Sequence, residues 1–191
     1  MNRKEIQKIE DELKALYYAA EGTHEHQDLI RSFWDHHVVP VKDLSIEMAE
    51  KYGADSDICW LGALFHDFAL LSGQEPHDEL GAIQTKDFLL ERGFDEKFAE
   101  TVSETVLRHR CKKFIPETEE DKVVATADAM AHFLPAFYLG IAVIAKNDYE
   151  EMKNSSFEKL EQDFQNKIFF EEEKKLLHDR MQEFRKTVLY K

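Results

Sequence analysis

The sequence predicts an all-α protein, and three observations lead to that class. Only seven glycines and four prolines interrupt the 191 residues. Apolar residues recur at helical spacing along most of the chain, and no stretch shows the strict apolar-polar alternation of a half-buried strand. At this length we expect one domain with flanking terminal elements. The 43% hydrophobic content is sufficient for a buried core, and the 34% charged content indicates high solubility.

The charge and the apolar content argue against several classes of protein. The net charge is −14, and an acidic surface repels phosphate backbones, so a nucleic acid polymer is not expected as a partner. No apolar run is long enough to span a bilayer, and the charged stretch MNRKEIQKIE is unlike a secretory signal. Cys59 and Cys111 are expected to be reduced thiols. These features together favour a cytoplasmic protein.

Helices are expected in order along the chain, separated by turns at YGAD (52–55), SGQEP (72–76), RGFD (92–95) and FIPET (114–118). The last two of these helical segments are expected to be interrupted. The expected segments cover residues 3–20, 35–52, 56–71, 77–92, 95–109, 118–146 and 156–189.

The segment 35–52 contains two adjacent histidines, and helix geometry distinguishes them. Helical steps from His37 reach an apolar stripe, whereas the same kind of steps from His36 reach Pro40 and three acidic residues. We therefore expect His37 to face the core and His36 to face solvent. Pro40 lies near the start of this helix, where proline is tolerated best. The apolar stripe consists of Val41, Leu44, Met48 and Ala49.

The segment 56–71 is apolar nearly all round and is therefore expected to be the central helix. Its stretch ALFHDFALL, residues 63–71, contains only two polar side chains, His66 and Asp67. Burying a charged carboxylate costs roughly several kcal/mol unless a cation or a hydrogen-bond network compensates it. This segment therefore needs a polar or ionic partner from elsewhere in the protein.

Three further polar residues can be placed on inward faces of the next helices. His77 follows Pro76 at the start of a helix, and Gly81, one turn later, allows a neighbouring segment to approach closely. His109 is the last residue of an apolar stripe. Asp128 shares a helix face with small and apolar residues. Taken singly, an inward histidine is more often a hydrogen-bonded core residue. Likewise, His109 could complement a helix dipole, and Asp128 could cap a helix or pair with a lysine.

Taken together, four histidines and two aspartates on inward faces favour a metal site. A set of imidazoles and carboxylates suits a divalent transition metal such as Fe, Mn, Zn, Co or Ni, and the chain has no thiolate set for structural zinc.

The last segment, 156–189, carries two apolar stripes separated by an acidic break at Glu171–Glu173. It is expected to be a helix or a hairpin that covers the core, and a homodimer interface is the alternative. The stripes are Phe157, Leu160, Phe164 and Ile168, then Leu177, Met181, Phe184 and Val188.

The order of these residues resembles the H…HD…D signature of the HD-domain superfamily of metal-dependent phosphohydrolases. HVVPVKDLSIEMAEKYGADSD followed by LGALFHDFA is similar to the family's first-histidine helix and its AALLHDIG-like segment. PHDELGA and VLRHR look like the two extra histidines of members that hold two metals. The resemblance covers about residues 33–140. It implies a single HD-domain helical bundle over 1–191, with 1–32 and 150–191 as flanking helices.

This resemblance also implies a ligand set and a reaction. One metal would be held by His37, His66, Asp67 and Asp128, and a second by His77 and His109. Asp67 would bridge the two metals and take part in catalysis, in which a metal-activated water hydrolyses a small phosphate ester or a nucleotide. Positive side chains beside His109 would bind the phosphorylated substrate. These are Arg108, Arg110, Lys112 and Lys113.

The chain departs from the family pattern in one segment. It has TADAMA where family members that act on nucleotides often have a DADRLD-like sequence, so nucleotide specificity does not follow from the resemblance. His132, one turn beyond Asp128, is expected to be a core or surface histidine rather than a pocket residue. Glu75 and Asp78, which flank His77, are the nearest candidates for proton transfer.

Two other functions fit the same residues. Some HD-domain proteins are diiron oxygenases with a similar ligand set, and others are non-catalytic modules that bind a nucleotide or a partner as sensors. A missing ligand would favour a sensor, and none is missing in this sequence. Hydrolase activity therefore ranks first, oxygenase activity second and a binding module third.

Overall fold

The protein is described from a computed structural model that covers residues 3–20, 33–73, 75–135, 137 and 149–188, without the side chains of 149–156 and 187–188. Within these residues all regular secondary structure is helical, which confirms the predicted class. The elements are α1 (Arg3–Ala19), the π-helical turn η1 (Trp34–Val38), α3 (Val39–Tyr52), α4 (Ser56–Phe65), the 3₁₀ turn η2 (Phe68–Ser72), α5 (His77–Glu91), α6 (Glu96–Arg108), α7 (Glu119–His132), α9 (Tyr149–Asn166) and α10 (Glu171–Val188).

Side-chain caps fix where several of these helices begin. The carboxylate of Asp55 accepts hydrogen bonds from the first backbone N–H groups of α4, and Asp95 does the same for α6. Thr118 and Asp121 form a reciprocal capping box at the start of α7. Such caps satisfy N–H groups that have no partner within the helix.

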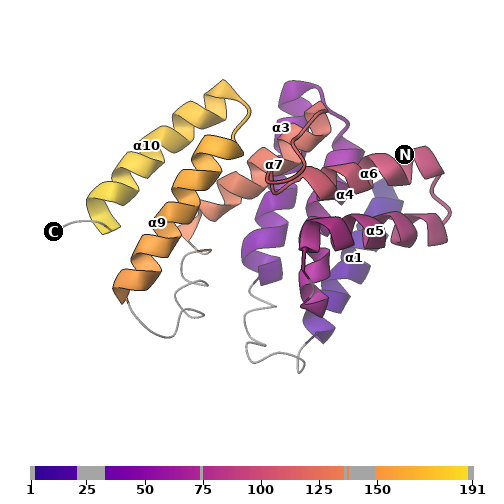
Figure 1. Ribbon diagram of the computed structural model, residues 1–191. Coiled ribbons are helices and arrows are strands. Elements are labelled where there is room, and N and C mark those ends of the chain that lie inside the picture. Colours follow the sequence, from indigo (N-terminus) through magenta and orange to yellow (C-terminus); the bar gives the residue numbers. More distant parts are fainter. Residues whose placement is uncertain (1–2, 21–32, 74, 136, 138–148, 189–191) are drawn as a thin grey trace.

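The buried apolar side chains form two clusters, and α4 contributes to both. One cluster joins α1, η1, α4, α5 and α6, and includes Ile6, Leu13, Trp34 and Phe65. The other joins α3, α4, α7, α9 and α10. Figure 1 shows the pair α9 and α10 side by side at one end of the molecule, next to α7. Because α4 lies in both clusters, the turn that follows it lies at their junction.

The C-terminal segment is the expected hairpin, but its break lies earlier than predicted. Helix α9 ends at Asn166, and α10 begins at Glu171. The acidic run Glu171–Glu173 is therefore the first turn of α10, where negative charge complements the helix dipole. Leu160, Ile168 and Leu177 are buried in the same cluster as α3, α4 and α7. The hairpin thus covers the core.

The predicted central helix over 56–71 also ends early. Helix α4 stops at Phe65, residues 66 and 67 form a turn, and η2 follows. The ring of His66 contacts the carbonyl of Ala63 with 2.7 Å between Nδ1 and O. This side-chain bond occupies a carbonyl that would accept a backbone N–H if the helix continued. The predicted segment over 118–146, which was expected to be interrupted, has a break after His132, and residues 135 and 137 are again helical. Positions 136 and 138–146 lie outside the described residues.

Among the described residues, none of the helices is both long enough and apolar enough to span a membrane.

Candidate metal centre

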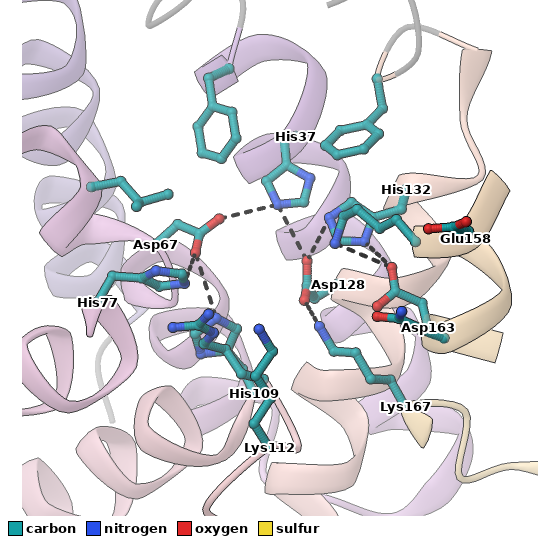
Figure 2. A pocket seen from close by; sticks show the side chains of 16 residues that line it. His37, Asp67, His77, His109, Lys112, Asp128, His132, Glu158, Asp163 and Lys167 are labelled. Carbon is teal, nitrogen blue, oxygen red and sulfur yellow. Dashed lines mark hydrogen bonds and ion pairs between the residues drawn. The ribbon is translucent and has the colours of Figure 1, made fainter. Parts of the chain in front are cut away.

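A pocket of about 440 Å³ opens at the junction of the two apolar clusters, and most of the predicted metal ligands line it. Figure 2 shows His37, Asp67, His77, His109 and Asp128 directed toward one another from separate elements. They come from η1, the turn after α4, the first residue of α5, the C-cap of α6, and α7. His37 is 1% exposed, whereas its neighbour His36 is exposed, as the helical spacing predicted.

The first group of side chains that could hold a cation contains His37, His66 and Asp128, all of them buried. The Nε2 atoms of His37 and His66 are 3.0 Å apart. Oδ1 of Asp128 lies 3.3 Å from Nε2 of His37 and 3.9 Å from Nε2 of His66. Two imidazole nitrogens and a carboxylate oxygen therefore converge on one point.

The second group contains Asp67, His77 and His109. Oδ1 of Asp67 lies 3.1 Å from Nε2 of His77 and 3.5 Å from Nε2 of His109. Its other oxygen, Oδ2, lies 3.2 Å from Nε2 of His66 and 3.4 Å from Nε2 of His37. The carboxylate of Asp67 therefore lies between the two groups, with one oxygen toward each.

In three of these histidines, the ring nitrogen that does not face the other ligands, Nδ1, contacts an oxygen atom. Nδ1 of His66 contacts the carbonyl of Ala63 at 2.7 Å, and Nδ1 of His109 contacts that of Val106 at 2.6 Å. A carbonyl can only accept, so Nδ1 carries the proton in both rings and Nε2 keeps its lone pair for a cation. Nδ1 of His77 contacts the Glu75 carboxylate at 3.1 Å.

The pKa values of the carboxyl groups fit a cation site. Burial would raise the pKa of Asp67, but the surrounding rings, that of His66 foremost, hold it well below its usual range. Burial would also raise the pKa of Asp128, but Lys167 and His132 hold it well below that range. Burial lowers the pKa of His109. Burial would lower the pKa values of His37 and His77, but neighbouring carboxylates raise them. The site therefore offers anionic carboxylates and a neutral His109, and a cation would compete with protons for His37 and His77.

Sequence reasoning missed His132 and the polar side chains that α9 and the linker after it bring to this pocket: Glu158, Lys159, Gln162, Asp163 and Lys167. His132 was expected in the core or at the surface, but it lines the pocket, with its ring stacked on that of His37. Its Nε2 lies 3.3 Å from Oδ1 of Asp128, and its Nδ1 lies 2.7 Å from the carboxylate of Asp163. Burial lowers the pKa of His132 to about 4. Lys167 donates a hydrogen bond to Oδ2 of Asp128.

The four positive residues expected beside His109 differ in their contacts, and Arg108 is not among the residues that line the pocket. Its guanidinium binds Glu104, Glu117 and the carbonyl of Ile115, so it supports the loop after α6. The other three expected residues are Arg110, Lys112 and Lys113.

Arg110 and Lys112 do line the pocket. Arg110 also contacts Glu75 and the buried Asp78. Glu75 is therefore engaged with His77 and Arg110, and Asp78 with Arg110. Lys113 pairs with Glu79 instead of lining the pocket.

Comparison with known protein families decides the classification. The model of the family described as HD domain matches residues 34–132, more than half of the chain. The chain belongs to the HD-domain family. The match begins just before His37 and ends at His132, so α9 and α10 of this HD-domain protein lie beyond it. No match was found among curated proteins.

Solved structures share the fold of this HD-domain protein over nearly the whole chain. A predicted HD-superfamily hydrolase from an uncultured Thermotogales bacterium is 21% identical, with a TM-score of 0.60 over 99% of this chain and 96% of its own. YpgQ from Bacillus subtilis, solved in complex with ADP, is 20% identical, with a TM-score of 0.65 over 93% and 89%. An HD-superfamily hydrolase from Bacillus thuringiensis is 18% identical, with a TM-score of 0.67 over 96% of both chains.

Proposed function

We propose that this HD-domain protein is a metal-dependent phosphohydrolase that acts on a small phosphate ester or a nucleotide. The position of Asp67 carries this proposal. One of its oxygens faces His77 and His109, and the other faces His37 and His66. A carboxylate between two groups of imidazoles is suited to bridge two divalent cations.

In the proposed site, His37, His66, Asp67 and Asp128 hold one cation, and Asp67, His77 and His109 hold the other. Bound transition metals of this kind lower the pKa of water and polarise phosphoryl oxygens. The protein's own contribution is to keep the ligands in place. The backbone carbonyls of Ala63 and Val106 fix two of the rings through their Nδ1 atoms.

The pocket has the size and charge expected for a phosphorylated small molecule. A volume of about 440 Å³ lies within the range of small-molecule sites. Arg110 and Lys112 line the pocket of a chain whose net charge is −14. Lys159 and Lys167 line the pocket as well, and its four carboxylates, Asp67, Asp128, Glu158 and Asp163, would be offset by bound divalent cations, so that an anionic substrate would be attracted. These residues therefore favour phosphate ester chemistry over oxygenation of an uncharged substrate.

Two features support a nucleotide as the phosphorylated substrate. Phe33 and Phe137 line the pocket, and their ring centroids lie 4.7 and 5.3 Å from that of His37. Aromatic rings at a pocket wall provide a surface on which a nucleobase can stack. The structurally similar YpgQ was solved in complex with ADP. We accordingly rank nucleotides first in the substrate screen.

A metal analysis followed by a phosphatase screen tests the proposal. The purified protein is stripped with a chelator, reloaded with Mn, Co, Ni or Mg, and assayed for phosphate or pyrophosphate release from nucleotides and phosphomonoesters. We expect release only with metal, and its loss in Asp128→Asn. Iron-dependent visible absorption with dioxygen consumption, and no phosphate release, would instead identify an oxygenase. Ligand binding without turnover would identify a sensor.

A further inference from the structure

Lys167 reaches the candidate metal centre from outside the residues that match the family model. It lies just after α9, in the linker 167–170 that joins α9 to α10, and is 6% exposed. Its ammonium lines the pocket and binds Oδ2 of Asp128, as Figure 2 shows. A lysine is almost never buried unless it is paired, and here the partner is a proposed metal ligand. Its place next to the centre therefore needs a function.

The linker is fixed to the helix that carries Asp128. The hydroxyl of Thr126 donates to the carbonyl of Lys167 at 3.0 Å and accepts from the backbone N–H of Phe169 at 3.2 Å. The side chains of Ile168 and Phe170 are buried in the apolar cluster. The carbonyl of Lys167 and the N–H of Phe169 are therefore both fixed to Thr126, which anchors the linker beside α7.

The two oxygens of Asp128 have separate partners. Oδ1 faces the rings of His37, His66 and His132, and Oδ2 faces Lys167. A cation held by Oδ1 and the histidines would leave the contact with Lys167 intact. An ammonium has three N–H donors, and among the described residues the hydrogen bond to Asp128 is the one that Lys167 donates from its side chain. Its remaining donors are available to an acceptor in the pocket.

The other cations of the pocket are less suited to hold an anion at the centre. Arg110 is shared between Glu75 and Asp78, Lys159 lies 3.4 Å from the carboxylate of Asp163, and Lys112 is exposed at the pocket wall. Water screens exposed charges strongly, whereas a buried ammonium interacts with an anion through a medium of lower dielectric constant. Lys167 is therefore the strongest candidate for a contact with an anion beside Asp128.

We propose that Lys167 binds a phosphate oxygen of the substrate next to the metal centre. This inference rests on the proposed function, since it assumes that the substrate is a phosphate. The α9–α10 hairpin would then complete the site in addition to covering the core. The rival explanation is that Lys167 serves only as a counter-ion that compensates Asp128.

Calorimetric titration with inorganic phosphate tests the role of Lys167 on the full chain, with and without Mn²⁺. The variant is Lys167→Met, and the control is Lys175→Met, the same change at an exposed lysine of α10. We expect the phosphate affinity of Mn²⁺-loaded Lys167→Met to fall by roughly 10- to 100-fold, the effect of one charge-assisted hydrogen bond. The control should match the wild type. The affinity for Mn²⁺ itself should not fall, because the variant removes a positive charge from the site.

A second variant distinguishes the charge of Lys167 from its position in the pocket. Thr126→Val keeps the lysine but removes both side-chain bonds to the linker, so phosphate affinity should fall while Mn²⁺ content stays at the wild-type level. This variant also decides the matter if Lys167→Met loses its helical circular dichroism. Unchanged phosphate affinity in folded Lys167→Met, with tighter Mn²⁺ binding, would establish the counter-ion explanation instead. If the wild type and Lys167→Met hydrolyse phosphate esters equally well, this inference alone is overturned. If the wild type hydrolyses no phosphate ester, the proposed function is overturned.

Discussion

Replacing Asp67 by asparagine tests the bridging carboxylate with little change of side-chain size. The two oxygens of Asp67 lie between 3.1 and 3.5 Å from Nε2 of four histidines: His77, His66, His37 and His109. Asparagine offers one oxygen to one group of rings, and its NH₂ group cannot coordinate a cation on the other side. We therefore expect the variant to lose the second metal and most of the first.

The expected loss of stability in Asp67→Asn follows from the burial of this carboxylate. Removing one partner from a buried charged pair costs about 3–5 kcal/mol, which corresponds to a fall in Tm of about 6–20 °C for a chain of this length when the metal is chelated. Metal binding stabilises the wild type by about 4 kcal/mol at a free concentration of ~1,000 Kd. The difference between the Tm values with Mn²⁺ and with chelator should therefore be large for the wild type and small for Asp67→Asn.

Thermal unfolding, metal content and phosphate release are the three measurements for this variant. The helical circular dichroism below Tm should remain, because the helices around Asp67 are packed in two apolar clusters. If Asp67 were only a buried hydrogen-bond partner, the variant would lose stability without any specific loss of metal. Stoichiometric metal and wild-type turnover in Asp67→Asn would refute the bridging role.

Three further predictions concern residues that do not line the pocket. A Cβ atom at Gly62 would lie 2.1 Å from Oγ1 of Thr105, so Gly62→Ala should lower the free energy of unfolding by about 1–3 kcal/mol in denaturant titration. Burial would raise the pKa of Glu173, but its hydrogen bond with Lys51 lowers it in the folded protein. The ionised Glu173 therefore stabilises the fold above pH 4.5, its usual pKa, and this stabilisation is lost as the pH falls through the lower pKa of the folded state. The Tm difference between wild type and Glu173→Gln should therefore disappear in acid, and an equal difference at all pH values would contradict this. Arg108→Ala should cost about 1–2 kcal/mol through its lost hydrogen bonds and leave KM unchanged, whereas a raised KM with unchanged Tm would restore Arg108 to the substrate site.

Inward-facing residues that continue a helical apolar stripe could be identified from the sequence. His37 begins an apolar stripe and is buried, whereas the adjacent His36 is exposed. His109 ends the stripe of α6 and lies at its C-cap. A periodic pattern carries this information because the helix fixes the direction of each side chain. The one-sided burial of these helices therefore follows from local sequence alone.

Contacts between distant segments could not be identified in this way. Lys167 lies 39 residues from Asp128, and no local spacing links the two. His132 looked like a core histidine because its partner, Asp163, lies 31 residues away in α9. The end of α4 could not be predicted because the sequence stays largely apolar beyond Phe65. In the structure, the His66 ring binds the carbonyl of Ala63 in the last turn of the helix.

The number of metal ions per chain tests the central claim most directly. Metal-free protein is dialysed against excess Mn²⁺ or Co²⁺, and the bound metal is counted for the wild type and for the double variant His77→Ala/His109→Ala. The two groups of ligands predict two ions per wild-type chain and one per chain of the double variant, which keeps His37, His66 and Asp128. A wild type that holds no transition metal at saturation, or a double variant that still holds two ions, would contradict the proposed centre.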